Sequence, residues 1–260
     1  MHISLLYNNL QLAQRTAITA GKEIMSFYHA QIKEEKKADQ SPITIADKTS
    51  HEIIIKELST TSHPMLSEEG EIPPYEERRK WNYFWMIDPL DGTREFIDKT
   101  GDFTVNIALI HQGIPVLGVV YLPVSETLFF ALKGFGAFKE NKMNCQKIKA
   151  ASFSLTQPKL KVVASRSNFD EKTKNYIACL NKPKLIHIGG ARKFMKVACG
   201  EAHIYPRFAP TMEWDTAAAQ IIVEEAGGKV CQTDGKTPLT YNKENLSNPY
   251  FIAFGELKNT

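Results

Sequence analysis

An apolar run ends abruptly in two aspartates at Trp85-Met86-Ile87-Asp88-Pro89-Leu90-Asp91-Gly92-Thr93. The run predicts a buried strand, and Asp followed by Pro favours a type I turn whose ends lie within about 7 Å of each other. Asp88 and Asp91 occupy those ends, so we expect their carboxylates to converge and either share a proton or hold a cation. Oxygen ligands without a nearby His or Cys favour Mg²⁺, Ca²⁺ or Mn²⁺ over zinc. An ordinary surface turn would explain the same residues.

The bulk properties are those of an ordinary globular protein. Its 260 residues suffice for one large domain or two modest ones. The 32 basic residues balance 29 acidic ones, which argues against a nucleic-acid polymer as partner. No apolar stretch approaches the roughly 18 residues that span a bilayer, and no secretory signal pattern is present. We expect a cytoplasmic protein, either monomer or homodimer; peripheral association with the inner face of the cell membrane stays open.

The cysteines and histidines do not suggest a zinc or thiol site. The four cysteines are widely scattered, and none forms a C-x-x-C pair or has a histidine partner at zinc spacing. We expect them to be reduced and mostly buried. The seven histidines do not cluster either, so they are interpreted as structural or exposed residues.

The first half of the chain predicts a long helix followed by several strands. A stripe from Leu6 to Tyr28 at spacings of three and four predicts an amphipathic helix. An extended segment then leads to Asp47, which can cap the next helix. Residues 65–70 predict a short strand ending in Glu68, and residues 71–80 a loop that could move over the site. Three strands are expected after the central motif, the first two as a hairpin, at residues 105–110, 116–121 and 127–132.

The second half alternates strands with helices, which is typical of an α/β layer. We place a domain boundary in the polar stretch 141–160, giving domains 1–150 and 151–260. Strands are expected at 161–165, 185–188 and 203–206, and helices at 169–180, 191–199 and 215–226. Asp215 would start the last of these helices, where N-capping alone explains an aspartate.

Three motifs together resemble the inositol monophosphatase superfamily of Mg²⁺-dependent phosphatases. They are Ser67-Glu68-Glu69, the central Asp88-Pro89-Leu90-Asp91-Gly92-Thr93, and Trp214-Asp215-Thr216-Ala217-Ala218-Ala219 ahead of Ala226-Gly227-Gly228. The resemblance extends from Ser41 to Gly228. Within the superfamily the chain is most similar to the CysQ-type 3′(2′),5′-bisphosphate nucleotidases, through segments 88–96, 103–110, 118–124, 164–167 and 205–208.

The resemblance implies a role for each acid. The metal ligands would be the carboxylates of Glu68, Asp88, Asp91 and Asp215 and the backbone carbonyl of Leu90. Four crowded acids repel one another unless two or three divalent ions, here Mg²⁺, neutralise them. Thr93 and Asp47 are similar to the family's water-activating pair, with Glu68 sharing this work.

Further residues would bind the substrate. The amides of Gly92 and Thr93 would hold phosphate oxygens near Asp91 and Asp215. A second phosphate would be met by a set from the second half: Ser165, Gly189, Lys193 and Arg207. Here the sequence departs from the family pattern, because Gly189-Gly190-Ala191-Arg192-Lys193 stands where Gly-Ser-Ser-x-Lys is usual. Asn141-Lys142 also replaces a common Asn-Gly.

The resemblance implies a layered α-β-α-β-α fold with the metal site between the two halves. It also implies Mg²⁺-dependent hydrolysis of 3′-phosphoadenosine 5′-phosphate to AMP and phosphate, as part of sulfate assimilation, with inhibition by lithium. Hydrolysis of inositol 1-phosphate at the same metal site is the nearest alternative. A non-catalytic metal- or nucleotide-binding regulator is another, although the intact acids and Thr93 argue against it. A nucleic-acid-binding module would rest only on the pI near 8.5.

Overall fold

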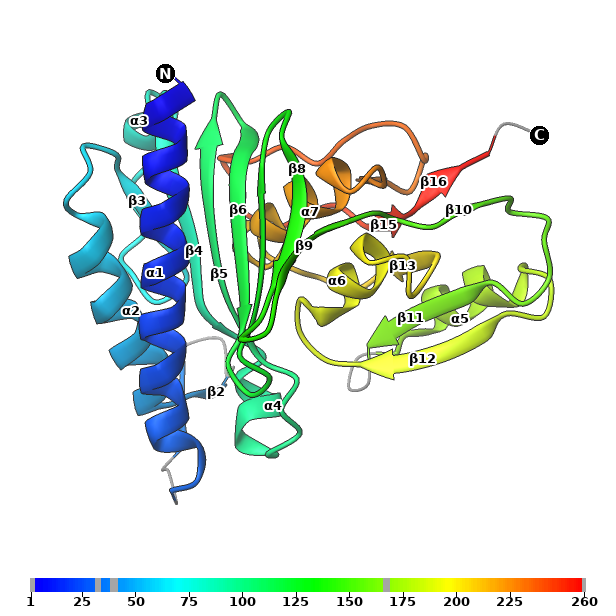
Figure 1. The fold of residues 1–260 in the computed structure, drawn as a ribbon, viewed down its shortest axis with the longest axis horizontal. Coiled ribbons are helices and arrows are strands. Elements are labelled where there is room, and N and C mark those ends of the chain that lie inside the picture. The colour runs from blue at the N-terminus through cyan, green and yellow to red at the C-terminus, as the bar shows by residue number, and fades with distance from the viewer. Residues whose placement is uncertain (1–2, 31–33, 38–41, 166–168, 259–260) are drawn as a thin grey trace.

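Two β-sheets alternate with three layers of helices in the computed structural model, which describes residues 3–30, 34–37, 42–165 and 169–258. Helices α1 (Ile3–Tyr28) and α2 (Ile45–Leu58) cover the outer face of a seven-stranded sheet (Figure 1). Helices α6 (Arg192–Ala198) and α7 (Ala217–Glu225) lie between this sheet and a five-stranded one. Helix α5 (Glu171–Ala178) packs beyond the second sheet. The predicted α-β-α-β-α fold class is confirmed.

The outer helices pack through small and aliphatic side chains. The stripe predicted on α1 is buried, including Leu10, Ala17 and Ile24. Gly21 lets the helix approach the sheet closely, because a Cβ there would lie 2.5 Å from the Tyr121 ring. Below α1, the short strands β1 (Glu35–Lys36) and β2 (Pro42–Ile43) form an antiparallel pair.

The seven-stranded sheet has the order β3-β4-β5-β6-β7-β8-β9. Strands β3 and β4 are parallel, and every later neighbour pair is antiparallel. The predicted hairpin and third strand are therefore confirmed. The bounds are β3 Met65–Ser67, β4 Tyr83–Asp91, β5 Thr104–His111, β6 Ile114–Leu122, β7 Thr127–Leu132, β8 Gly136–Glu140 and β9 Cys145–Ile148.

The predicted type I turn at Asp88–Asp91 is replaced by an irregular end of β4. Asp88 lies opposite Asn106 and Asp91 opposite Thr104, so β4 carries one residue more than β5 between these pairs. Such a bulge bends a strand and redirects its side chains. The Asp88 carboxylate stabilises the bend by accepting a hydrogen bond from the Leu90 amide at 3.2 Å.

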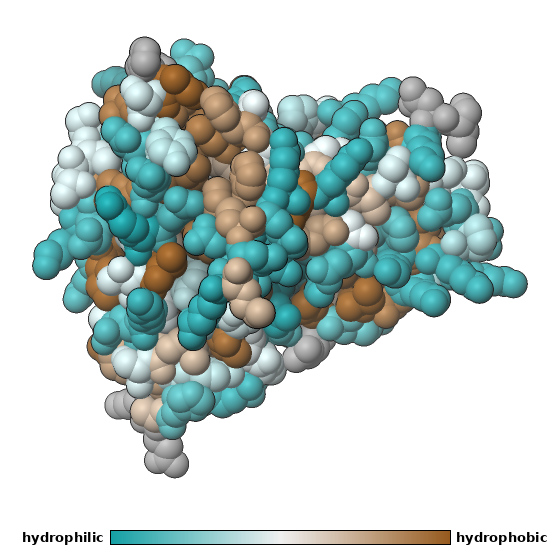
Figure 2. All heavy atoms as spheres, in the orientation of Figure 1, coloured by the Kyte–Doolittle hydropathy of each residue, from teal (hydrophilic) through white to brown (hydrophobic). Residues whose placement is uncertain are grey.

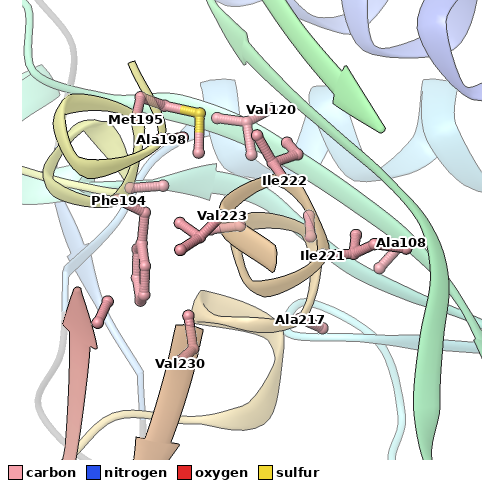
Figure 3. Packing of buried hydrophobic residues seen from close by; sticks show 14 of the residues in the cluster. Ala108, Val120, Phe194, Met195, Ala198, Ala217, Ile221, Ile222, Val223 and Val230 are labelled. Atoms are coloured by element: carbon pink, nitrogen blue, oxygen red, sulfur yellow. The ribbon is translucent and has the colours of Figure 1, made fainter. Parts of the chain in front are cut away.

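The largest hydrophobic cluster fills the space between the two sheets. In Figure 3, Ile222 of α7 points toward Val120 of the first sheet, while Val223 points toward Phe194 of α6. Gly118 on β6 permits close packing of α7, because a Cβ there would lie 2.4 Å from the Ala218 carbonyl. This packing fixes α7, and with it the chain that leads into α7.

The five-stranded sheet has the order β12-β11-β13-β15-β14. Strand β11 runs parallel to β12 and β13, and β15 runs antiparallel to β13 and β14. A separate parallel pair, β10 (Ser152–Phe153) with β16 (Glu256–Leu257), lies near the C-terminal end. The bounds are β11 Lys161–Ser165, β12 Lys184–Ile188, β13 Ile204–Arg207, β14 Lys229–Gln232 and β15 Phe251–Phe254.

Other local predictions were wrong. The segment 71–80, expected to be a loop, contains the short helix α3 (Tyr75–Arg78), whose Arg78 is buried. The cysteines are free thiols but are not mostly buried. Cys231 is buried, Cys199 is half-buried, and Cys145 and Cys179 are exposed. Ser41 and the pair 166–167 of the family resemblance fall outside the described residues.

The surface shown in Figure 2 is mostly hydrophilic, with hydrophobic side chains scattered over it. Large apolar or aromatic side chains that are exposed include Ile3, Leu5 and Tyr7 at the start of α1. Within the described ranges, no helix combines the length and the hydropathy needed to cross a bilayer.

Candidate active site

Four acids from three segments meet at one edge of the seven-stranded sheet. In the parallel pair β3–β4, Ser67 lies opposite Ile87, so the next residues along, Glu68 after the end of β3 and Asp88 within β4, lie side by side. Asp88 is buried, and burial raises its pKa well above the usual value. The nearby charges of Glu68, Asp91 and Asp215 raise it further. The four acids predicted from the motifs therefore do form one electrostatic group.

Asp215 reaches this group from the second half of the chain. It ends a 3₁₀ turn, η1 (Glu213–Asp215), and α7 begins only at Ala217, so the prediction that Asp215 caps that helix was wrong. One carboxylate oxygen accepts a hydrogen bond from the Met212 amide at 2.9 Å. Burial, then the charges of Asp91 and Glu68, raise the pKa of Asp215 to about 8.

The donor set suits a hard divalent cation. It consists of carboxylates and the Leu90 carbonyl, which lies 3.4 Å from the Thr93 hydroxyl. Among the described residues, no three acidic, histidine or cysteine side chains already converge tightly enough to hold an ion. Glu68 is turned toward the Lys37 ammonium group, 2.7 Å from its carboxylate. Burial, and after it the neighbouring carboxylates, raise the pKa values of Asp88 and Asp215 by disfavouring their charged forms, so a bound cation would stabilise the ionised acids.

Thr93 and Asp47 form a hydrogen-bonded pair beside the acids. The Thr93 hydroxyl donates to Asp47 Oδ1 at 2.8 Å, and the other carboxylate oxygen accepts from the amide and hydroxyl of Thr44 at 2.8 and 2.6 Å. Thr44, and not Asp47, is the N-cap of α2, so Asp47 is the acidic partner of a capping box. This arrangement fixes the carboxylate of a residue that is almost fully buried.

A cleft of about 120 Å³ joins the acids to a group of cations. Its lining includes five predicted residues: Asp91, Ser165, Lys193, Arg207 and Asp215. Lys193 is buried, and burial lowers its pKa to about 8 although Asp91 opposes this change.

Within the described chain, Lys193 and Arg207 each have N–H donors that make no hydrogen bond. Lys193 Nζ donates to the Gly190 carbonyl at 2.7 Å. Arg207 donates to the Pro210 carbonyl at 3.2 Å, and its buried Nε has no hydrogen-bond partner among the described residues. Both side chains therefore have donors to offer to an anion.

The loop 189–191 is built around its two glycines. Gly190 has φ +54°, and a Cβ there would lie 2.6 Å from the Asp102 carbonyl. The Gly189 amide donates to Asp102 Oδ2 at 3.1 Å, and the Ala191 amide donates to Asp91 Oδ2. Glycine at position 190 thus allows the loop to approach close enough to hold Asp91. Gly189 itself does not line the cleft.

Gly92 also requires a left-handed backbone conformation. Its φ is +96°, and it precedes the short helix α4 (Thr93–Ile97). Since an L side chain rarely adopts this conformation, glycine is the residue that turns the chain from β4 into α4 beside Thr93.

Sequence reasoning missed three residues that shape the cleft. Glu95 and Tyr205 line it, and Asp102 lies behind it, where it pairs with the Arg192 guanidinium group. Glu95 and Tyr205 lay inside quoted motifs but received no role. Asp102 had no sequence signal, since its importance depends on contact with a loop that lies far along the chain.

The chain was compared with known proteins and structures. The inositol monophosphatase family profile matches residues 7–250. A relative from Salmonella typhimurium, named 3′(2′),5′-bisphosphate nucleotidase CysQ, is 42% identical over 246 residues, covering 93% of this chain and 98% of its own. The relative of the same name from Escherichia coli K12 is 43% identical over 240 residues, covering 90% and 95%.

Solved structures agree with this comparison. The crystal structure of CysQ from Bacteroides thetaiotaomicron, described as a bacterial member of the inositol monophosphatase family, is 41% identical and has a TM-score of 0.86. It matches over 96% of this chain and 98% of its own. The chain belongs to the inositol monophosphatase family.

Proposed function

We propose that this phosphatase is a Mg²⁺-dependent 3′(2′),5′-bisphosphate nucleotidase, which converts 3′-phosphoadenosine 5′-phosphate and water to AMP and phosphate. The observation that carries the proposal is that one cleft holds Asp91 and Asp215 together with Lys193 and Arg207. A substrate with two phosphates needs both groups. The acids would hold one phosphate with the help of divalent ions, and the cations would hold the other. The named activity of the similar relatives supports this assignment.

The acids and the Leu90 carbonyl would hold the divalent ions. Bound Mg²⁺ would neutralise the acids, stabilise negative charge on the phosphoryl oxygens and make a nearby water easier to deprotonate. Hard oxygen donors and four carboxylates match this ion better than a soft or nitrogen-binding metal.

Thr93 and Asp47 would activate the attacking water. Because the Thr93 hydroxyl already donates its proton to Asp47, its oxygen lone pairs are left to accept a hydrogen bond from water. Asp47 then receives the proton through the Thr93 hydroxyl as general base, with Glu68 as the second carboxylate near the water. The amides of Gly92 and Thr93 would orient the phosphate, and no side chain needs to be phosphorylated.

The cations favour a nucleotide over an inositol phosphate. Inositol 1-phosphate has no second phosphate to occupy Lys193, Arg207 and the neighbouring Ser165. Arg207 also lines a second, open hollow of about 450 Å³, together with Phe169 and Pro210. This hollow leaves room for a nucleoside beside the second phosphate.

The test measures phosphate release from 3′-phosphoadenosine 5′-phosphate and from inositol 1-phosphate, each with Mg²⁺ and with EDTA. We expect metal-dependent release with a strong preference for the nucleotide, and none from Asp91→Asn. Preference for the inositol ester would overturn the substrate assignment but keep the metal chemistry. Absence of release from both would overturn the proposed reaction.

Other parts of the proposal stay predictions. They are the number of Mg²⁺ ions, two or three, inhibition by lithium, a role in sulfate assimilation and a cytoplasmic location with or without peripheral membrane association. The monomeric or homodimeric state and the division into domains 1–150 and 151–260 also stay predictions.

A further inference from the structure

A buried arginine outside the cleft connects the two halves of the chain. Arg78 ends α3, in the segment that joins the strand before Glu68 to the strand that carries Asp88. Its side chain is 2% exposed, which is rare for an arginine unless the guanidinium group is well bonded. The neighbouring Arg79 is half exposed and pairs with Glu76.

The Arg78 guanidinium group holds a loop near the end of the chain. Nη1 donates to the Asn242 side-chain oxygen at 2.9 Å and to the Lys243 carbonyl at 2.6 Å, and Nη2 donates to the Glu244 carbonyl at 2.7 Å. The Asn242 side chain returns a hydrogen bond to the Arg78 carbonyl at 2.6 Å. One side chain thus organises three consecutive residues that lie more than 160 positions away.

The same loop holds Glu213, which is fully buried. Its carboxylate accepts hydrogen bonds from the Asn242 amide at 2.5 Å and the Lys243 amide at 3.0 Å, and it pairs with the Lys243 ammonium group at 2.5 Å. Asn242 has φ +72°, a left-handed backbone conformation that is uncommon in residues other than glycine and is kept here by the surrounding contacts. These contacts come from Arg78, which bonds the Asn242 side chain, and from Glu213, which accepts the Asn242 amide.

Glu213 and Asp215 belong to the same single turn, η1. The Asp215 amide bonds back to the Met212 carbonyl at 3.2 Å, so the orientation of Glu213 and that of Asp215 are not independent. The turn also packs against β4, the strand that carries Asp88 and Asp91, and against β5. A contact made by Arg78 is therefore transmitted through Asn242 and Glu213 to the one acid that the second half contributes.

We propose that Arg78 is a positioning residue for the divalent-metal site, which acts through Asn242 and Glu213 to hold Asp215 opposite Asp88 and Asp91. The inference rests on the proposed metal-dependent function. Arg78 touches neither the acids nor the cleft, and its effect is on where Asp215 stands. Residues that orient metal ligands in this way commonly change metal affinity or activity by about 10- to 100-fold when they are replaced.

The test compares Arg78→Lys with Arg79→Lys as the matched control. Lysine keeps the charge but is a point donor and cannot bridge three acceptors as the planar guanidinium does. We expect Arg78→Lys to raise the Mg²⁺ dissociation constant, measured by calorimetry on metal-free protein, by about tenfold or more. The Mg²⁺ concentration for half-maximal phosphate release should rise in parallel, and amide exchange at residues 212–216 and 241–244 should accelerate. Arg79→Lys should match the unmodified protein.

A second variant keeps the test decisive if Arg78→Lys does not fold. Asn242→Gly keeps the positive φ and the amide bond to Glu213 but loses the side-chain contacts with Arg78, so it should also weaken Mg²⁺ binding. Where both variants fold, the double variant should bind Mg²⁺ within about twofold of Arg78→Lys alone, because both changes break one connection.

Two results would overturn the inference. One is a folded Arg78→Lys protein with a lowered melting temperature but unchanged Mg²⁺ binding, since that describes a purely structural arginine. The other is unchanged Mg²⁺ binding in Asn242→Gly. Failure of the proposed function would be seen in the unmodified protein itself, which would then neither bind Mg²⁺ nor release phosphate.

Discussion

Replacing Gly190 by serine would restore a hydroxyl that the family pattern commonly has, and we expect this change to damage the enzyme. The new Cβ would lie 2.6 Å from the Asp102 carbonyl, and φ is +54° at this position. The backbone conformation alone costs a residue with a Cβ roughly 1–2 kcal/mol. Relief of the overlap moves the loop and weakens the bond from the Ala191 amide to Asp91, and a hydrogen bond to a charged group contributes about 1.5–3 kcal/mol.

The two terms add to about 2.5–5 kcal/mol, divided between stability and activity. We expect kcat/KM for the bisphosphate nucleotide to fall by roughly 10- to 1,000-fold, since about 1.4 kcal/mol corresponds to each factor of ten. The assay is steady-state phosphate release at saturating Mg²⁺, with thermal unfolding recorded in parallel.

Gly235→Ser is the matched control. Gly235 has a similar φ of +73°, but a Cβ there would have nothing within 4 Å. This variant should lose only the roughly 1–2 kcal/mol of backbone strain and keep its activity. If Gly190→Ser has the same kcat/KM as the unmodified protein and unfolds at the same temperature as Gly235→Ser, then the loop tolerates a side chain and the reasoning is refuted.

Three further predictions concern single side chains. Thr93→Val should lower kcat by about 10²- to 10⁴-fold with little change in KM, while Thr93→Ser retains activity; equal losses in both variants would contradict a role for the hydroxyl. Lys193→Met should raise KM for 3′-phosphoadenosine 5′-phosphate by roughly 10- to 100-fold but hardly affect adenosine 3′-phosphate, which lacks the second phosphate. Burial raises the folded-state pKa of Glu224 from 4.5 to about 7, so ionisation destabilises the fold as pH rises through this interval. Glu224→Gln should therefore be more stable at pH 8 by about 1–3 kcal/mol and similar at pH 4, as denaturant titrations at the two values would reveal.

The parts of the fold that the sequence predicts are those in which burial follows a simple period. The stripe from Leu10 to Ile24 on α1 and the apolar strands β5 to β7 were found in this way. Strand β9 was missed, because three of its four residues are exposed and the strand lies at the edge of the sheet. Helix α3 was missed because it is four residues long and buries an arginine, the reverse of what hydropathy predicts.

The site shows a similar division between local and distant causes. The acids were identified because each lies in a short motif, and the structure shows that the pairing of β3 with β4 brings Glu68 beside Asp88. The contacts of Asp102 with the loop 189–191 could not be predicted, since they join residues almost ninety positions apart. The change from Gly-Ser-Ser to Gly-Gly-Ala was visible in the sequence, but the Asp102 carbonyl that lies against Gly190 was not.

Through Asp91, the loop 189–191 is connected to the acids of the cleft as well as to its cations. The Asp91 carboxylate belongs to the acids that would hold the metal, and it also accepts the Ala191 amide one residue before α6 begins. Lys193 lies in the first turn of α6 and donates to the Gly190 carbonyl. The loop 189–191 is fixed by Asp102 at one end and by Asp91 at the other. It therefore sets the distance between the acids and Lys193, the cation that would bind the second phosphate. For this reason a disturbance at Gly190 should raise both the Mg²⁺ requirement and KM for the bisphosphate, whereas Lys193→Met should change KM alone.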